Sequence, residues 1–244
     1  MKKILINCDD LGMHPTINNG ILSVLDKGVV KSASLLPTGQ YFEEAILGLK
    51  KIGVSKIGVH LSLCAEYPKA PLMPVLSRSQ PFLSLEEWLQ TPRDLHLCQN
   101  EIIAQIEKVE KTGLQISHLD GHMFFYEPAV GGKKLFELVQ NIADRIKIPL
   151  RHQEGNQKRV SPSIRMIWDD YDTLESRFSF YENLFREDAC DFLELIIHPG
   201  TPAEEMKKFT NKPERRYADF LFFTDPKLRH NLRDLGWSAV GRSE

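Results

Sequence analysis

The chain has 244 residues, a formal net charge of -2 and 42% hydrophobic residues, as is usual for a soluble globular protein. The near-neutral charge argues against nucleic acid as a partner, because duplex binding leaves a basic footprint on a protein. The segment Met1–Asp10 holds too few apolar residues for a signal-peptide core or a membrane span. We therefore expect a cytoplasmic protein with neither a nucleic-acid nor a membrane partner.

The length and the cysteines limit the architecture. About 250 residues is the usual size of one α/β barrel, and the sequence contains no linker that would mark a boundary. We therefore predict one domain over residues 1–244. The four cysteines lie far apart in or beside apolar stretches, where a thiol packs as a small hydrophobe, so we expect no disulfide framework.

Short β-branched runs alternate with longer stretches whose apolar residues recur every three or four positions, a pattern typical of an α/β fold. Seven such strands alternating with helices favour a (β/α) barrel, whether complete or not, over an open sheet, although periodicity alone does not separate the two. The predicted strands are Ile4–Cys8, Ser32–Leu36, Ile57–Leu63, Gln115–Leu119, Pro149–Arg151, Phe192–His198 and Ser238–Val240. Helices are predicted from Pro15 to Gly28, from Asn100 to Lys111, and between Gly132 and Ile146.

Two long stretches break this rhythm. The segment Ala65–Ser84 contains four prolines and follows neither period, and loops of this length in a compact domain often serve as lids or binding loops. The segment His152–Trp168 is the second irregular stretch.

Ionisable side chains stand at the carboxyl ends of four predicted strands, where barrel enzymes place their catalytic groups. Two imidazoles and a carboxylate with open positions form a reasonable divalent-metal site, and Asp10, His60 and His122 are the natural set. The neighbouring Asp9 suits a base, and His198 is a second titrating group on another strand. A metal, a base and an acid are the parts of a hydrolase that acts on an amide or ester.

Each of these residues also has a structural explanation. An Asp pair after a strand can cap the next turn or helix. A single His at a strand end is more often hydrogen-bonded to the protein than bound to a metal. The placement of Asp or His at four separate strand ends favours the functional interpretation.

At these residues the sequence resembles the YdjC family of carbohydrate deacetylases, which includes the chitooligosaccharide deacetylases. The resemblance extends over essentially the whole chain, and it implies a distorted, incomplete TIM-like (β/α) barrel. It also implies a metal-dependent hydrolase that removes acetyl groups from N-acetylated amino sugars or short oligosaccharides. The ordered motifs are INCDDLG at 6–12, NNGIL at 18–22, GVHLSL at 58–63, SHLDGH at 117–122, LR at 150–151 and IHPG at 197–200.

The resemblance implies a role for each site residue. Arg151 matches an arginine that could hold the Asp9 carboxylate ionised and oriented. One divalent ion, Mg²⁺ or Zn²⁺, is the implied cofactor, and a small carbohydrate is the implied partner; a homodimer is left open. The metal ligands correspond to Asp10, His60 and His122, the general base to Asp9 and the general acid to His198.

The chain departs from the family pattern after the SHLDGH motif, where further histidines are common at alternate positions. Phe124 and Tyr126 stand there instead, and their rings could form an aromatic platform for a sugar. Trp88, Tyr67 and Tyr217 are other platform candidates, although packing is the more common role for such residues.

Two alternatives to the deacetylase stay open. A metal-dependent esterase or phosphoesterase could use the same site, because metal ligands do not encode the leaving group. A non-catalytic sugar-binding barrel is the alternative outside enzymes. The retention of all five candidate residues argues against the non-catalytic barrel.

Overall fold

The computed structural model describes residues 1–65, 72–77, 79–151, 163–166, 173–202, 204–210 and 212–242. The chain separates into two compact units. The first unit comprises Met1–Asp9, Thr16–Ala33 and Gln153–Glu244, and the second comprises Asp10–Pro15 and Ser34–His152.

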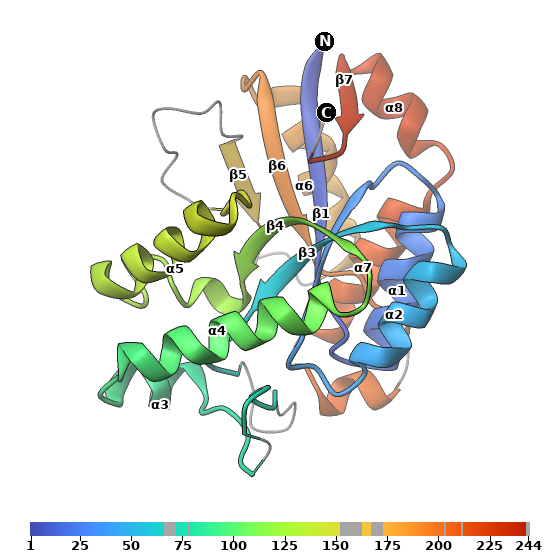
Figure 1. Cartoon of the computed structure of the whole chain (residues 1–244). Coiled ribbons are helices and arrows are strands. Elements are labelled where there is room, and N and C mark those ends of the chain that lie inside the picture. Colours follow the sequence, from blue (N-terminus) through green and yellow to red (C-terminus); the bar gives the residue numbers. More distant parts are fainter. Residues whose placement is uncertain are drawn as a thin grey trace. The chain divides into compact units, whose positions relative to one another are not determined.

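The first unit contains parallel strands in the order β5-β6-β1-β7 (Figure 1). The central strand β1 is buried from Ile4 onward, as expected for a strand covered on both faces. The strands are β1 (Lys2–Leu11), which continues into the second unit, β5 (Ser163–Met166), β6 (Phe192–Ile197) and β7 (Trp237–Val240). The helices are α1 (Pro15–Asp26), α6 (Leu174–Glu187), α7 (Pro213–Thr224), α8 (Leu228–Asp234) and the 3-10 helix η2 (Glu204–Lys208).

Helix α1 shows how local sequence determines these elements. Pro15 occupies its first position, where a missing N–H costs nothing. Ile17, Ile21 and Val24 then recur at helical spacing and are buried. Gly28 follows the helix at a φ of +71°, a left-handed conformation that glycine adopts without strain. The structure confirms this predicted helix.

The second unit contains parallel strands in the order β4-β3-β2. Helix α4 packs on β3, β4 and α5 (Figure 1). It begins earlier than predicted, because Asp94 caps the backbone N–H groups of His96 and Leu97. The strands are β2 (Ser32–Leu35), which begins in the first unit, β3 (Lys56–Leu61) and β4 (Gln115–Gly121). The helices are α2 (Phe42–Lys51), α3 (Leu85–Gln90), α4 (Leu95–Glu110), α5 (Lys133–Ile146) and the 3-10 helix η1 (His122–Phe124).

Parallel strands that alternate with helices confirm the predicted α/β class. Among the described residues no strand pairing closes a barrel, which agrees with an incomplete one. The predicted strand Pro149–Arg151 is reduced to a single bridge between Leu119 and Leu150. The expectation of irregular structure over His152–Trp168 is wrong at β5, because these four residues pair with β6; the rest of that stretch lies outside the described residues.

All four cysteines are free, as the sequence analysis expects. Burial raises the pKa of the Cys64 thiol to about 12.

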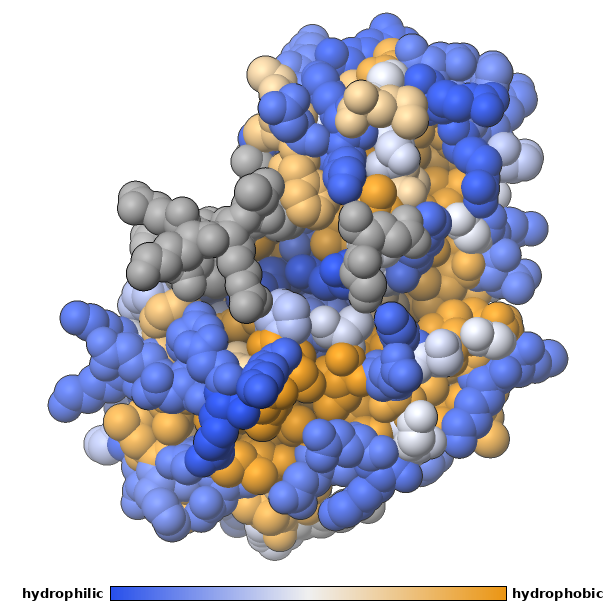
Figure 2. Space-filling view, turned by 45° about the horizontal axis from the view of Figure 1, so that its top comes forward, coloured by the Kyte–Doolittle hydropathy of each residue, from blue (hydrophilic) through white to orange (hydrophobic). Residues whose placement is uncertain are grey.

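Hydrophilic residues cover much of the face drawn in Figure 2, with hydrophobic residues between them. Among the residues that the structure describes, no helix is long and apolar enough to cross a membrane.

A buried ionic cluster joins α6 and α7 in the first unit. The Arg177 guanidinium donates from Nε and Nη2 to the two carboxylate oxygens of Asp219, and the Tyr181 hydroxyl donates to Asp219 Oδ1 at 2.6 Å. All three side chains are buried. Burial raises the pKa of the Tyr181 hydroxyl well above its usual value, and the negative charge of Asp219 adds to this effect.

We expect Tyr181→Phe to reduce the loss of stability at alkaline pH. The folded state keeps a proton that the unfolded chain releases above about pH 10. Stability that is present below about pH 10 therefore falls as pH rises, by up to about 1.4 kcal/mol per pH unit for one group. Urea unfolding between about pH 9 and pH 11 measures this slope.

Tyr217→Phe is the control for this measurement, because Tyr217 is a half-buried tyrosine of α7 whose hydroxyl is not part of the cluster. It should leave the slope unchanged. Identical slopes for wild type and Tyr181→Phe would contradict the expectation.

Candidate functional site

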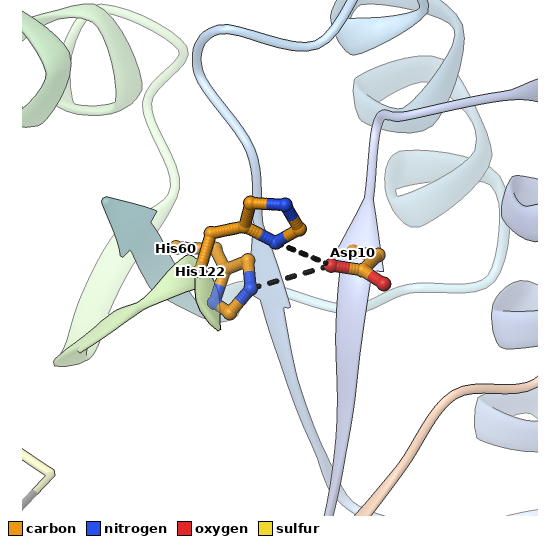
Figure 3. Close-up of side chains that lie close together, drawn as sticks. All are labelled: Asp10, His60 and His122. Atoms are coloured by element: carbon orange, nitrogen blue, oxygen red, sulfur yellow. Dashed lines mark hydrogen bonds and ion pairs between the residues drawn. The ribbon is translucent and has the colours of Figure 1, made fainter. Parts of the chain in front are cut away.

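Three polar side chains meet in the second unit (Figure 3). Asp10 Oδ1 lies 3.1 Å from His122 Nδ1 and 3.3 Å from His60 Nε2. The three residues are between 1% and 4% exposed, and the two imidazole rings meet edge to face at 5.4 Å between centroids. The structure therefore brings together the three side chains that were predicted as metal ligands.

The backbone is unusual at Asp10 and directly after His122. Asp10 has a φ of +74°, in the left-handed region that Asp adopts more readily than most residues. His122 begins η1, and the next residue, Met123, has a φ of +56°. Such conformations cost on the order of 1–3 kcal/mol each and cluster at functional sites. The local backbone is thus strained where the three side chains converge.

Asp120 of β4 holds His60 in one orientation. Its Oδ1 lies 2.7 Å from His60 Nδ1, and its Oδ2 lies 2.9 Å from Arg151 Nη1 and 3.2 Å from His118 Nε2. Burial raises the pKa of Asp120, but the Arg151 guanidinium, His60 and hydrogen bonds from both histidines outweigh it and hold the pKa well below its usual range. Asp120 is therefore a carboxylate that accepts the Nδ1 proton of His60, and this contact turns His60 Nε2 toward Asp10.

The spacing of these side chains suits a cation beside Asp10. Its Oδ1 is faced by two imidazole nitrogens, His122 Nδ1 and His60 Nε2. Two ligands about 2.0–2.2 Å from one ion are about 3.0–3.5 Å apart at tetrahedral or octahedral angles. The distances of 3.1 and 3.3 Å from Asp10 to the imidazoles match this spacing. The donor set therefore fits one divalent metal ion.

A glycine makes room for the support behind His60. A Cβ atom at Gly58 of β3 would lie 2.2–2.8 Å from ring atoms of His118. The register of β3 against β4 shifts between Ile57 and Gly58, and Ser117 Oγ lies 2.9 Å from His118 Nδ1. The glycine of the GVHLSL motif is thus required for the contact between His118 and Asp120.

The sequence analysis missed Asp120 and His118 as supports for the metal ligands. A signal was present, because His118, Asp120 and His122 occupy alternate positions, and alternate residues of a strand share a face. Gly121 lies between Asp120 and His122, and a side chain is excluded there because a Cβ atom would lie 2.6 Å from the ring of Tyr126.

Asp9 and His198 belong to the first unit. Asp9 is buried in β1 and accepts a hydrogen bond of 2.7 Å from Asn7 Nδ2. The Ser32 hydroxyl donates to Asn7 Oδ1, which orients the amide so that its NH₂ group faces Asp9. His198 follows β6, is buried, and its backbone N–H donates to Asp219 Oδ2 at 2.8 Å. The catalytic roles of Asp9 and His198 stay predictions.

Arg151 lies in the second unit, where its guanidinium pairs with Asp120. The predicted contact between Arg151 and Asp9 stays a prediction. Tyr126 is 1% exposed, and its hydroxyl donates to the carbonyl of Arg151. The interpretation of Tyr126 as a sugar platform is therefore wrong, because its ring fills space beside Gly121 rather than facing solvent.

The other aromatic candidates differ in exposure. Phe124 is half-buried and stays a candidate. Trp88 is buried beneath the Arg93 guanidinium, 4.4 Å from its ring centroid, and serves packing. Tyr217 is half-buried and stacks on Phe220. Tyr67 lies outside the described residues.

Parallel strands and an Asp-His-His cluster at strand ends define an α/β protein with a site suited to a metal ion. The chain belongs to the YdjC-like protein family, whose profile matches residues 3–234. This membership confirms the family resemblance of the sequence motifs.

Named relatives cover nearly the whole chain. The carbohydrate deacetylase of Vibrio campbellii is 23% identical over 245 residues, which are 99% of this chain and 95% of the relative. Carbohydrate deacetylase 1 of Listeria innocua is 26% identical over 238 residues, or 94% of each chain. A crystal structure from Enterococcus faecalis V583, described as a cellobiose-phosphate cleavage protein, matches with a TM-score of 0.78 and 22% identity over 99% of this chain and 98% of that chain. The structural match shows that the fold is shared.

We expect Asp120→Asn to weaken Zn²⁺ binding about 10- to 100-fold, the usual effect of removing a carboxylate behind a metal-binding histidine. The amide no longer supplies the negative charge that orders His60 and neutralises Arg151. Calorimetric titration of Zn²⁺ into metal-free protein measures the affinity, and His60→Ala, which removes a predicted ligand, should abolish binding.

Asp144→Asn is the matched control, because it changes an exposed carboxylate of α5 in the same way. Circular dichroism checks that each variant is folded. Wild-type affinity in a folded Asp120→Asn variant would show that Asp120 does not order the site.

Proposed function

We propose that this protein is a metal-dependent deacetylase that removes the acetyl group from N-acetylated amino sugars or short oligosaccharides. The observation that carries the proposal is the buried cluster of Asp10, His60 and His122, whose potential ligand atoms lie within 4.8 Å of one another. The relatives named carbohydrate deacetylase, which align over nearly the whole chain, support the substrate class.

Asp10, His60 and His122 would hold one divalent ion. When bound, such an ion supplies Lewis-acid chemistry, polarising a carbonyl group and lowering the pKa of water. Imidazole ligands suit Zn²⁺, whereas carboxylate and water suit Mg²⁺, so both ions belong in the assay. Asp120 and Arg151 keep the His60 ring in the orientation that the ligand role needs.

Asp9 and His198 would move the two protons of the reaction. Asp9 accepts a proton from water as the water oxygen bonds to the acetyl carbon. The carbon–nitrogen bond then breaks, and His198 donates a proton to the departing amine. The products are acetate and a free amino sugar.

Acetate release from mono- and di-N-acetylated sugars tests this function directly. Metal-free protein should be inactive, added Zn²⁺ or Mg²⁺ should restore turnover, and His60→Ala should stay inactive with either ion. Turnover of aryl acetates alone would favour an esterase, and phosphate release from sugar phosphates would favour a phosphoesterase. Sugar binding without turnover in the presence of metal would favour a non-catalytic barrel.

For Asp9→Asn we expect at least about a 100-fold loss of kcat, the usual scale for a missing general base. Metal content, measured by inductively coupled plasma mass spectrometry, should stay at the wild-type level. Asp26→Asn, an exposed change near the end of α1, is the control. Loss of both metal and activity in Asp9→Asn would indicate that the roles of Asp9 and Asp10 are exchanged.

His198→Ala should slow the N-acetyl substrate far more than an activated aryl acetate. An amine is a poor leaving group unless it is protonated, whereas an activated phenolate leaves without that proton. The measurement is kcat on both substrates at equal metal content, with the exposed His230→Ala as control. Equal losses on the two substrates would exclude His198 as the general acid.

A further inference from the structure

A buried carboxylate holds the peptide group of His198. Asp219 of α7 is 0% exposed, and its Oδ2 accepts the backbone N–H of His198 at 2.8 Å. A charge at this depth is costly unless other groups pair with it. Asp219 therefore depends on the donors that α6 presents to it.

Two side chains of α6 set the orientation of this carboxylate. Arg177 donates to both oxygens of Asp219, with Nη2 at 3.2 Å from Oδ2, and a two-point contact fixes the plane of the carboxylate. The Tyr181 hydroxyl donates to Oδ1 at 2.6 Å, and its raised pKa keeps it protonated as a donor. With these partners in place, Oδ2 points at the His198 peptide.

The turn after His198 is held at further points within the first unit. The Gly200 N–H donates to the carbonyl of Arg216 at 2.9 Å, so α7 binds the turn twice. Helix α1 lies so close that a Cβ atom on Gly20 would be 2.7 Å from the Cα of Gly200. The Thr201 N–H also donates to the carbonyl of Thr16 at 2.9 Å. The backbone that carries the imidazole thus has little freedom to shift.

We propose that Asp219 is a positioning residue for His198: by holding its peptide N–H, Asp219 sets the direction in which the imidazole leaves the end of β6. The inference rests on the proposed role of His198 as the general acid. Proton transfer to a departing amine depends on close alignment, and a misplacement of about 1 Å can cost about 100-fold in rate. Asp219 acts through the backbone and does not contact the substrate.

The first test is Asp219→Asn, which preserves the size of the side chain but removes its charge. It should lower kcat on the N-acetyl substrate about 10- to 100-fold, with KM and metal content unchanged. The loss on an activated aryl acetate should be much smaller. Leu232→Ala, which truncates a buried side chain of α8, is the control for stability: it should lower the unfolding temperature without a substrate-selective loss.

A double-mutant cycle separates positioning from stability. His198→Ala removes the imidazole but keeps the peptide N–H that Asp219 binds. In the His198→Ala background, Asp219→Asn should therefore cause no further loss of turnover on the N-acetyl substrate. A purely structural role would give the same fold loss in both backgrounds, and that result would overturn the proposal, as would equal losses of the Asp219→Asn variant on the two substrates.

Tyr181→Phe decides the question if Asp219→Asn does not fold. It removes one donor to Asp219 and leaves the ring packed against Phe222 and Phe223. A smaller loss of kcat, selective for the N-acetyl substrate, supports the proposal, and the absence of selectivity overturns it.

If His198→Ala itself shows no selectivity between the two substrates, His198 is not the general acid, and the proposed positioning role of Asp219 fails as well. Selectivity in His198→Ala but in neither Asp219→Asn nor Tyr181→Phe removes the positioning role alone.

Discussion

The hydrogen bond between His60 Nδ1 and Asp120 decides which nitrogen of His60 faces Asp10. Because Asp120 is buried and paired with Arg151, it is ionised and accepts the Nδ1 proton. His60 Nε2 then faces the Asp10 carboxylate, beside His122 Nδ1. The Asp-His-His set thereby has a spacing that suits a divalent metal ion. Gly58 and His118 serve this interaction, since the glycine gives the His118 ring room to reach Asp120.

Each of the two units contains a buried carboxylate that pairs with an arginine. Asp120 and Asp219 are each 0% exposed, and each pairs with an arginine that offsets the cost of burial. Each carboxylate then has an oxygen in contact with a histidine of the proposed site, through the ring of His60 in one unit and through the peptide of His198 in the other. A buried ion pair is a weak source of net stability, but it fixes the orientation of the groups that it contacts.

Family membership and geometry explain different parts of this protein. The aligned relatives carry the name carbohydrate deacetylase, whereas the structure explains why a metal ion fits Asp10, His60 and His122. Tyr126 packs beside Gly121 and donates to the carbonyl of Arg151. It thereby supports the backbone at Arg151 and serves a packing role.

The sequence by itself determined the α/β class, helix α1 and the candidate residues at strand ends, because periodicity and capping act over a few neighbouring residues. Alternation along β4 also held the signal for Asp120. Only the tertiary structure decided the left-handed backbone at Asp10, the four-residue strand β5 and the pairing of Arg177 with Asp219. Arg177 and Asp219 lie 42 positions apart on helices whose periodicity does not distinguish them from surface charges. Whether a charge is buried, and which partner neutralises it, depends on packing between distant segments, and no local pattern encodes that.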